Sequence, residues 1–235
     1  MVLLAPSQAT DRGAEAIRGV VRTLDQAAIA TELTTQRVED VRVRDGAPFK
    51  KGDVLLTFDC KRLEAEADVA KAQVREQQLA HDSSLALEKR QAIGRFDVEI
   101  AAARLARARA ELSVHHARLL NCKIIAPFAG RVSELAIRAH EFPQPGRPLL
   151  TVVGTERIEI ELLIPSRALD KIKPGHQFQF SIDELAAAFP ARVDRVGASV
   201  DPVSQLVKIY AHFVELPRDV LPGMSGTASG LDGKR

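Results

Sequence analysis

Two cysteines are the residues of this sequence whose type and spacing most clearly suggest chemistry. Cys60 and Cys122 are its only cysteines, and an oxidising compartment would allow them to form a disulfide. The six histidines show no metal-ligand spacing, because His115 and His116 are adjacent and would point to different sides of a helix. No nucleophile–base pair, carboxylate pair or glycine-rich phosphate loop stands in a recognisable motif. The sequence therefore predicts a protein that is not an enzyme, with no metal or cofactor site.

The composition argues against a nucleic-acid-binding protein. The 235 residues carry 33 Lys and Arg against 31 Asp and Glu, a net charge of +2, whereas phosphate binding requires a clear basic excess. Only 4% of the residues are aromatic and there is no Trp, which leaves few faces for base stacking. No apolar stretch approaches the roughly 20 residues of a membrane-spanning helix.

An internal repeat organises the chain. Residues 34–60 and 128–154 align at a constant offset of 94, without a gap. Both copies alternate apolar and polar residues and then turn through a glycine, which predicts β-strands. Neither copy can bury its apolar face alone, so we expect the two to pack together as a small β-sandwich. The identical pairs are Arg37/Arg131, Val38/Val132, Arg44/Arg138, Gly52/Gly146, Leu55/Leu149, Leu56/Leu150 and Thr57/Thr151.

The insertion between the copies, residues 61–121, predicts a helical hairpin. It contains no Pro and a single Gly, Gly94, and it is rich in helix-forming residues. Facing positions have residue numbers that add up to 182, the pattern of two antiparallel helices that turn near residue 91. Both halves carry a seam at heptad spacing, with Leu63, Ala67, Ala70, Val74, Gln77, His81 and Ser84 facing Leu119, His115, Leu112, Ala108, Leu105, Ala101 and Val98.

The same register places Cys60 opposite Cys122 at the base of the hairpin. Opposed positions of packed helices can lie within the Cα separation of about 4.4–6.8 Å that a disulfide allows. We therefore predict a disulfide that closes a loop of about 60 residues and clamps the hairpin onto the β-domain. A pair of buried, reduced thiols on helices too far apart is the alternative.

The remaining residues, 156–231, return to strand patterning. Pro174-Gly175 and Pro222-Gly223 punctuate this region as turns. Several short strands at this spacing predict a second, barrel-like β-domain. The expected strands cover residues 158–162, 177–182, 191–196 and 207–213, and a short helix is expected at residues 169–172.

This order of parts resembles that of the periplasmic adaptor proteins, also called membrane fusion proteins, of the HlyD-like family found in efflux pumps. The resemblance implies a mainly β fold with a long α-helical hairpin. A split lipoyl-like domain (a barrel-sandwich hybrid) would comprise residues 17–60 and 122–155, an antiparallel coiled-coil hairpin residues 61–121, and a β-barrel residues 156–231. The segments that carry the resemblance are residues 46–59 (GAPFKKGDVLLTFD), 125–132 (IAPFAGRV), 145–150 (PGRPLL), 173–175 (KPG), 200–202 (VDP) and 221–224 (LPGM).

The resemblance also implies a function and a compartment. Such adaptors link an inner-membrane transporter, commonly of the resistance–nodulation–division (RND) type, to an outer-membrane channel. They would work as an oligomeric ring, by resemblance a hexamer, in the periplasm of a Gram-negative bacterium and in association with its inner membrane. No cofactor and no nucleic acid is implied.

The family resemblance points to the hairpin tip as the surface that meets the channel. Leu87 and the pair Ala92-Ile93 follow the family pattern, whereas Ser83 and Gly94 stand where the family has Arg and Ser. We therefore expect the partner-binding tip to use Leu87, Arg90, Ala92, Ile93, Gly94 and Arg95.

A lipoyl- or biotinyl-type carrier domain with a helical protein-binding arm is the alternative function. Lys61 lies at the junction where a carrier domain would present its modified lysine. A swinging-arm lysine needs an exposed tight turn, whereas here a long helix is expected to begin, and the Met-Lys-Met signature of biotin carriers is absent. Lys61 is therefore interpreted as a residue of the first helical turn.

Overall fold

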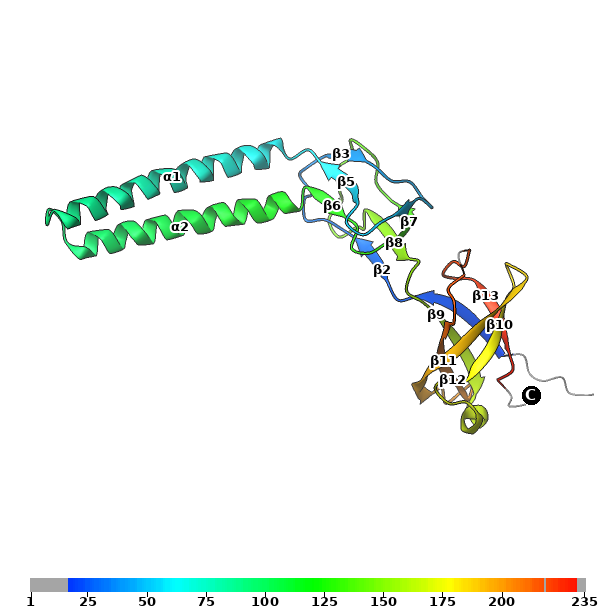
Figure 1. Cartoon of the computed structure of the whole chain (residues 1–235). Coiled ribbons are helices and arrows are strands. Elements are labelled where there is room, and N and C mark those ends of the chain that lie inside the picture. Colours follow the sequence, from blue (N-terminus) through cyan, green and yellow to red (C-terminus); the bar gives the residue numbers. More distant parts are fainter. Residues whose placement is uncertain (1–16, 218, 232–235) are drawn as a thin grey trace, which may run out of the picture. The chain divides into compact units, whose positions relative to one another are not determined.

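The computed structural model describes residues 17–217 and 219–231 of the chain. These residues form two compact units, one of residues 27–152 and one that joins residues up to 26 with residues from 153 onward. Figure 1 shows the elements of both units. Within the described residues, no helix is long and apolar enough to cross a membrane.

Two small sheets and a helical hairpin build the unit of residues 27–152. Strand β4 precedes the hairpin in sequence but pairs with β7, which follows it, and β6 follows the hairpin but pairs with β5. The two halves of the repeat therefore interlock. One sheet has the order β2 (Gln26–Ile29), β8 (Leu150–Gly154), β7 (Gly130–Leu135) and β4 (Pro48–Phe49), and the other has the order β3 (Val38–Val41), β5 (Val54–Phe58) and β6 (Lys123–Ile125).

The repeated residues supply the core of this unit. Leu55 and Leu56 of the first copy and Leu149 and Leu150 of the second are all at most 2% exposed, within one apolar cluster. A fully buried Leu side chain contributes about 1.5–3 kcal/mol relative to an exposed one. The Leu-Leu pairs of the repeat thus mark the positions where both copies are buried in a shared core.

The hairpin forms as predicted, from α1 (Lys61–Lys89) and α2 (Arg95–Leu120), joined by a turn at residues 90–94 (Figure 1). At 1.5 Å per residue, α1 is about 43 Å long. Every position of the predicted seam is buried or half-buried. The fully buried residues of the seam are Leu63, Ala67, Val98, Ala101, Leu105 and Ala108.

The other unit is a closed six-stranded barrel with its own core. Four of its strands match the expected ones, whereas the expected short helix is a 3-10 helix that begins earlier, η1 (Ser166–Lys171). Phe180, Ile160 and Leu162 lie fully buried inside the barrel. The strand order is β1 (Ile17–Thr23), β13 (Ser225–Ser229), β10 (Gln177–Ile182), β11 (Ala187–Val200), β12 (Leu206–Phe213) and β9 (Ile158–Pro165).

The structure corrects the predicted domain boundary at residue 17. Residues 17–23 were expected in the sandwich, but they form β1, which pairs with both β9 and β13 and closes the barrel. Closure leaves no strand edge unpaired, and Val21 is 1% exposed in the barrel core. Strand β13 also escaped prediction because its residues are small. A Cβ at Gly226 would lie only 2.8 Å from Cζ of Phe180, so bulky strand residues do not fit there.

Candidate docking surfaces

The end of α1 at the hairpin tip is a well-defined turn. The N–H of Ala92 donates to the carbonyl of Leu87 (3.0 Å) and the N–H of Gln91 donates to that of Glu88 (2.7 Å). This is the hydrogen-bond pattern of a Schellman motif. Gln91 takes the left-handed position, with φ of 58°, where glycine is normally preferred.

The start of α2 fixes the other side of the tip. The N–H of Gly94 donates to Oδ2 of Asp97 (3.2 Å), and the acidic Asp97 lies in the first helical turn, where it is favoured by the helix dipole. Nε of Arg95 donates to Oε1 of Glu99 (3.1 Å). Both ends of the turn at residues 90–94 are therefore closed by local hydrogen bonds.

The turn gathers the predicted tip residues and adds one that the prediction missed. Leu87, Arg90, Ala92, Gly94 and Arg95 are exposed and Ile93 is half-buried. Phe96 is 72% exposed and Leu87 is 40% exposed. Large exposed apolar side chains beside cations are typical of protein-binding surfaces. The position of Phe96 outside the heptad seam was the signal that could have identified it. We call these seven residues the tip surface.

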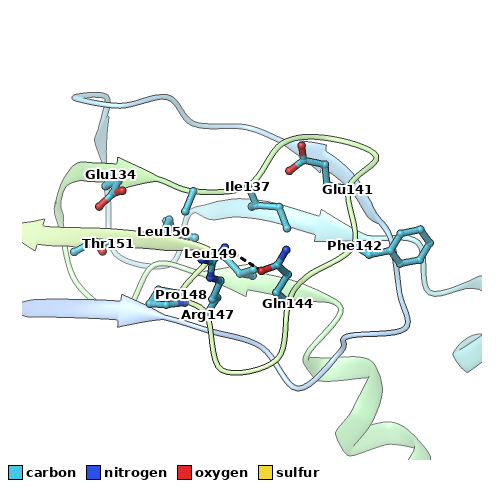
Figure 2. A pocket seen from close by; sticks show the side chains of 11 residues that line it. Glu134, Ile137, Glu141, Phe142, Gln144, Arg147, Pro148, Leu149, Leu150 and Thr151 are labelled. Carbon is cyan, nitrogen blue, oxygen red and sulfur yellow. Dashed lines mark hydrogen bonds between the residues drawn. The ribbon is translucent and has the colours of Figure 1, made fainter.

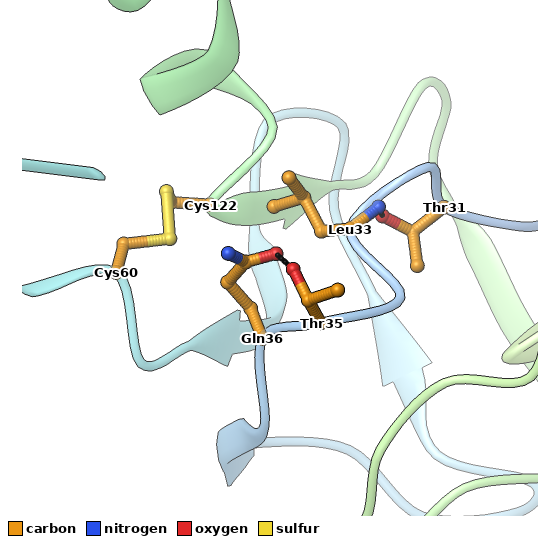
Figure 3. Close-up of a disulfide and its surroundings, with 6 residues drawn as sticks. All are labelled: Thr31, Leu33, Thr35, Gln36, Cys60 and Cys122. Atoms are coloured by element: carbon orange, nitrogen blue, oxygen red, sulfur yellow. Dashed lines mark hydrogen bonds between the residues drawn. A yellow bond between two sulfur atoms is a disulfide. The ribbon is translucent and has the colours of Figure 1, made fainter. Parts of the chain in front are cut away.

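The base of the hairpin holds both cysteines. Cys60 and Cys122 form a disulfide in the structure, with their Cα atoms 6.2 Å apart (Figure 3). The two residues are 6% and 8% exposed. The N–H of Phe58 donates to the carbonyl of Cys122 (2.9 Å), so the strand that enters the hairpin is also hydrogen-bonded to the one that leaves it. The disulfide thus joins the two chain segments at the point where sheet becomes helix.

Lys61 follows the disulfide directly and begins α1, with its side chain exposed. It therefore lies on a long helix at the base of the hairpin. A carrier lysine would need an exposed tight turn between strands.

A cleft beside β7 and β8 was not predicted from the sequence (Figure 2). It has a volume of about 380 Å³. Ile137 and Leu149 are buried at its floor, and Oε1 of Gln144 at its rim accepts a hydrogen bond from Nη1 of Arg147 (3.0 Å). Phe142 is 59% exposed. Within residues 17–217 and 219–231, no group of three His, Cys, Asp or Glu residues could hold a metal ion, so the cleft offers apolar contact and hydrogen bonds rather than metal chemistry.

The outer face of the barrel carries an ordered ion-pair network. Arg195 donates to Glu159 (2.8 Å) and to Asp194 (3.1 Å), and its guanidinium lies 4.1 Å from the centre of the Tyr210 ring. The hydrogen bond from Arg195 to Glu159 raises the pKa of Arg195. These contacts hold the side chains of β9, β11 and β12 in place.

The turn between β11 and β12 is shaped by one carboxylate. Oδ1 of Asp201 accepts hydrogen bonds from the N–H groups of Ser204 (2.8 Å) and Val203 (3.1 Å) and from the Ser204 hydroxyl (2.9 Å). The backbone bond from Ser204 is the main reason that the pKa of Asp201 lies below its ordinary value. The turn presents Val203, which is 92% exposed.

No protein-family model matches the chain. An uncharacterised protein of Haemophilus influenzae is 26% identical over 214 residues, which is 91% of this chain and 55% of that protein. The chain therefore spans about half the length of this curated relative.

Two solved structures show the same fold over most of the chain. The membrane fusion protein Spr0693 of Streptococcus pneumoniae superposes with a TM-score of 0.75 at 14% identity, covering 92% of this chain and 98% of that one. A MacA–MexA chimeric protein that contains the α-hairpin domain of Pseudomonas aeruginosa MexA also superposes with a TM-score of 0.75, at 21% identity, covering 91% of this chain and 79% of that one. The resemblance to the membrane fusion, or periplasmic adaptor, proteins is confirmed at the level of the fold.

Proposed function

We propose that this protein is a periplasmic adaptor that links an inner-membrane transporter, of the RND type, to an outer-membrane channel. The proposal rests on one structural feature, a long helical hairpin with an exposed apolar and basic tip, inserted between two interlocked halves of a sandwich. An arm of about 43 Å is much longer than the packing of the small sandwich requires. The fold shared with membrane fusion proteins supports the proposal.

Each part of the molecule has a role in this proposal. The tip surface binds the channel through Leu87 and Phe96, with Arg90 and Arg95 contributing charge. The β-domains meet the transporter, and copies of the chain assemble as a ring, a hexamer by resemblance. A periplasmic location, in association with the inner membrane, fits a disulfide at the hairpin base. The transporter largely selects the exported substrate.

Efflux measured in cells that lack the chromosomal copy tests this function. Phe96→Asp and the double reversal R90E/R95E should abolish efflux and leave the melting temperature of the purified protein unchanged, because these side chains are exposed. Leu120→Asp is the matched control. It lies on the same helix at the hairpin base and is 76% exposed, close to the 72% of Phe96, so efflux should persist. Full efflux with the tip variants would reject the tip surface, and full efflux without the protein would reject the adaptor function.

A further inference from the structure

Each helix of the hairpin carries a second heptad seam, on the face directed away from its partner helix. These outer seams are exposed except at Ile100, which is half-buried. They include large apolar side chains, with Val69 72%, Leu79 64% and Val114 52% exposed. A solvated helix face normally carries polar residues, so an exposed apolar row at heptad spacing predicts a helical partner. The outer seam of α1 is Ala65, Val69, Ala72, Glu76, Leu79 and Ser83, and that of α2 is Ile100, Ala103, Arg107, Ala110, Val114 and Ala117.

We propose that the outer seam of α1 in one copy of this chain packs against the outer seam of α2 in the next copy. The partner is therefore a second copy of the chain, and the contact repeats from copy to copy. The biological setting of this contact rests on the proposed adaptor function, whereas the contact itself is a property of the chain.

The register of the two outer seams matches without any shift along the helices. Facing positions inside the hairpin have residue numbers that add up to 182, a register fixed at the base by the Cys60–Cys122 disulfide. Facing positions of the two outer seams add up to 182 or 183. Rotation about an axis parallel to the hairpin keeps every residue at its height, so neighbouring copies would meet in this register.

Side-chain size is complementary across the proposed contact. Leu79 of one copy would lie opposite Ala103 of the next, and Ile100 would lie opposite Ser83. Large residues opposite small ones allow two helix surfaces to interdigitate. Neither seam places two bulky residues of this kind against each other at these levels.

Charge is also complementary, and it selects which helices meet. Glu76 is the only charged residue of the α1 outer seam and would face Arg107, the only charged residue of the α2 outer seam. Nε of Arg107 donates to Oε1 of Glu111 (2.8 Å), which leaves further guanidinium donors for Glu76. Parallel contacts between two α1 helices or two α2 helices would bring like charges together. The charges therefore favour the α1–α2 contact, which is heterologous and generates rings when the rotation closes.

The angle between inner and outer seams gives the assembly a curvature. With 100° per residue, the outer seam lies about 160° from the inner seam on both helices, measured through the face that contains Gln73 on α1 and Arg104 on α2. The hydrogen bond from Nη2 of Arg109 to Oε1 of Gln78 (2.6 Å) marks the opposite face of the hairpin. Repeated packing would thus curve towards Gln73 and Arg104 and enclose a polar inner wall.

Cysteine cross-linking of the purified full-length chain tests the contact. The double variant L79C/A103C, treated with a short bifunctional thiol reagent under conditions that preserve the native disulfide, should give a ladder of dimers and larger species. Leu79→Cys alone and Ala103→Cys alone should stay monomeric, because identical seams do not meet. The control pair L79C/R104C has a thiol at nearly the same height but on the inner wall, and should not form a ladder. Absence of the ladder, or an equal ladder from the control pair, would overturn the proposal.

Charge exchange tests the pairing of Glu76 with Arg107. Sedimentation velocity should show that E76R and R107E each self-associate about tenfold more weakly than wild type, because each places like charges in contact. Mixing the two variants should restore assembly, since the E76R chain then presents arginine to the glutamate of the R107E chain at every contact. Arg104→Glu, the matched reversal one turn away, should assemble as wild type. A mixture that remains as weak as its components would refute this pairing between copies.

The outcomes separate this contact from the adaptor function. Loss of efflux in the Phe96→Asp variant without a cross-linked ladder would leave the function standing and remove the contact. A ladder together with unimpaired efflux in cells that lack the protein would do the reverse.

Discussion

Removal of the disulfide should destabilise the hairpin-bearing unit while leaving the barrel unchanged. Cys60 and Cys122 are separated by 62 residues, and both lie in the unit of residues 27–152. Cross-linking restricts the unfolded chain, and for a loop of this length the chain-entropy model gives about 4 kcal/mol of stabilisation. With a urea m-value of about 1.5–2 kcal/mol/M for a unit of this size, the unfolding midpoint should fall by about 2–3 M.

The chain offers one spectroscopic probe for each unit. Both α-helices belong to the disulfide-bearing unit, so circular dichroism at 222 nm reports mainly its unfolding. The protein has no Trp and a single Tyr. That residue, Tyr210, lies on β12 of the barrel beneath the guanidinium of Arg195, so tyrosine fluorescence reports the barrel. Urea titrations of the oxidised protein, the reduced protein and the C60A/C122A variant should differ at 222 nm and coincide in fluorescence.

Two results would refute this reasoning. The first is a 222 nm transition with the same midpoint in oxidised and reduced protein, which would mean that the cross-link restricts nothing that matters for stability. The second is the titration of two free thiols in denatured protein taken directly from the periplasm, which would show that the bond does not form in cells. A fluorescence midpoint that shifts equally would show that the barrel depends on the clamp.

Four further predictions concern single positions. Gln91→Gly should stabilise the hairpin-bearing unit by up to about 1 kcal/mol at 222 nm, because Gln91 holds a left-handed φ of 58°; an unchanged midpoint would refute a strained tip. Gly226→Ala should destabilise the barrel by about 2 kcal/mol in tyrosine fluorescence, since the added Cβ would clash with Phe180; wild-type stability would contradict this close approach. Because the folded-state pKa of Asp201 lies below its ordinary value near 3.8, its stabilising effect on the barrel is complete above that value and is lost as the pH falls through the lower one; Asp201→Asn should remove this acid dependence, and an unaltered pH profile would speak against it. Finally, intact-mass spectrometry of protein from cells should show no lipoate or biotin on Lys61, and either adduct would favour the carrier alternative.

Patterns that repeat along the chain made most of the fold predictable. The hairpin followed from its heptad spacing, because every seam position is buried or half-buried in the structure. The interlocked halves followed from the Leu-Leu pairs at residues 55–56 and 149–150, which occupy one core. Such periodicities predict an element because burial acts on every repeat of the pattern.

Elements defined by a single long-range contact escaped prediction. Strand β1 pairs with β9 and β13, which are far away in the sequence, and its seven residues form no pattern with their neighbours. Strand β13 has the sequence SGTAS because Gly226 must approach the ring of Phe180. A strand selected for small size carries no apolar alternation, so the sequence alone offers no sign of it.

The tip was predicted from a resemblance and the outer seams were not predicted at all. Leu87 and Arg90 through Arg95 surround one turn and could be identified by their position between two helices. Phe96 and the outer seams are different, because their significance lies in exposure, which a sequence does not display directly. An apolar residue outside the inner seam becomes informative only once the inner seam is known to be closed.

The two seams of the hairpin together suggest why an arm of this kind would depend on its neighbours. The inner seam of α1 contains the polar residues Gln77, His81 and Ser84, and Nδ1 of His81 and of His115 is buried without a hydrogen-bond partner among the described residues. Each such group costs about 1–3 kcal/mol, so the inner seam is weaker than a fully apolar one. The outer seam of the same helix holds Leu79, which is 64% exposed. Apolar surface that would strengthen a solitary hairpin therefore faces outward, where only another copy can bury it. The disulfide at the base and the neighbouring arms would then supply the rigidity that the inner seam lacks.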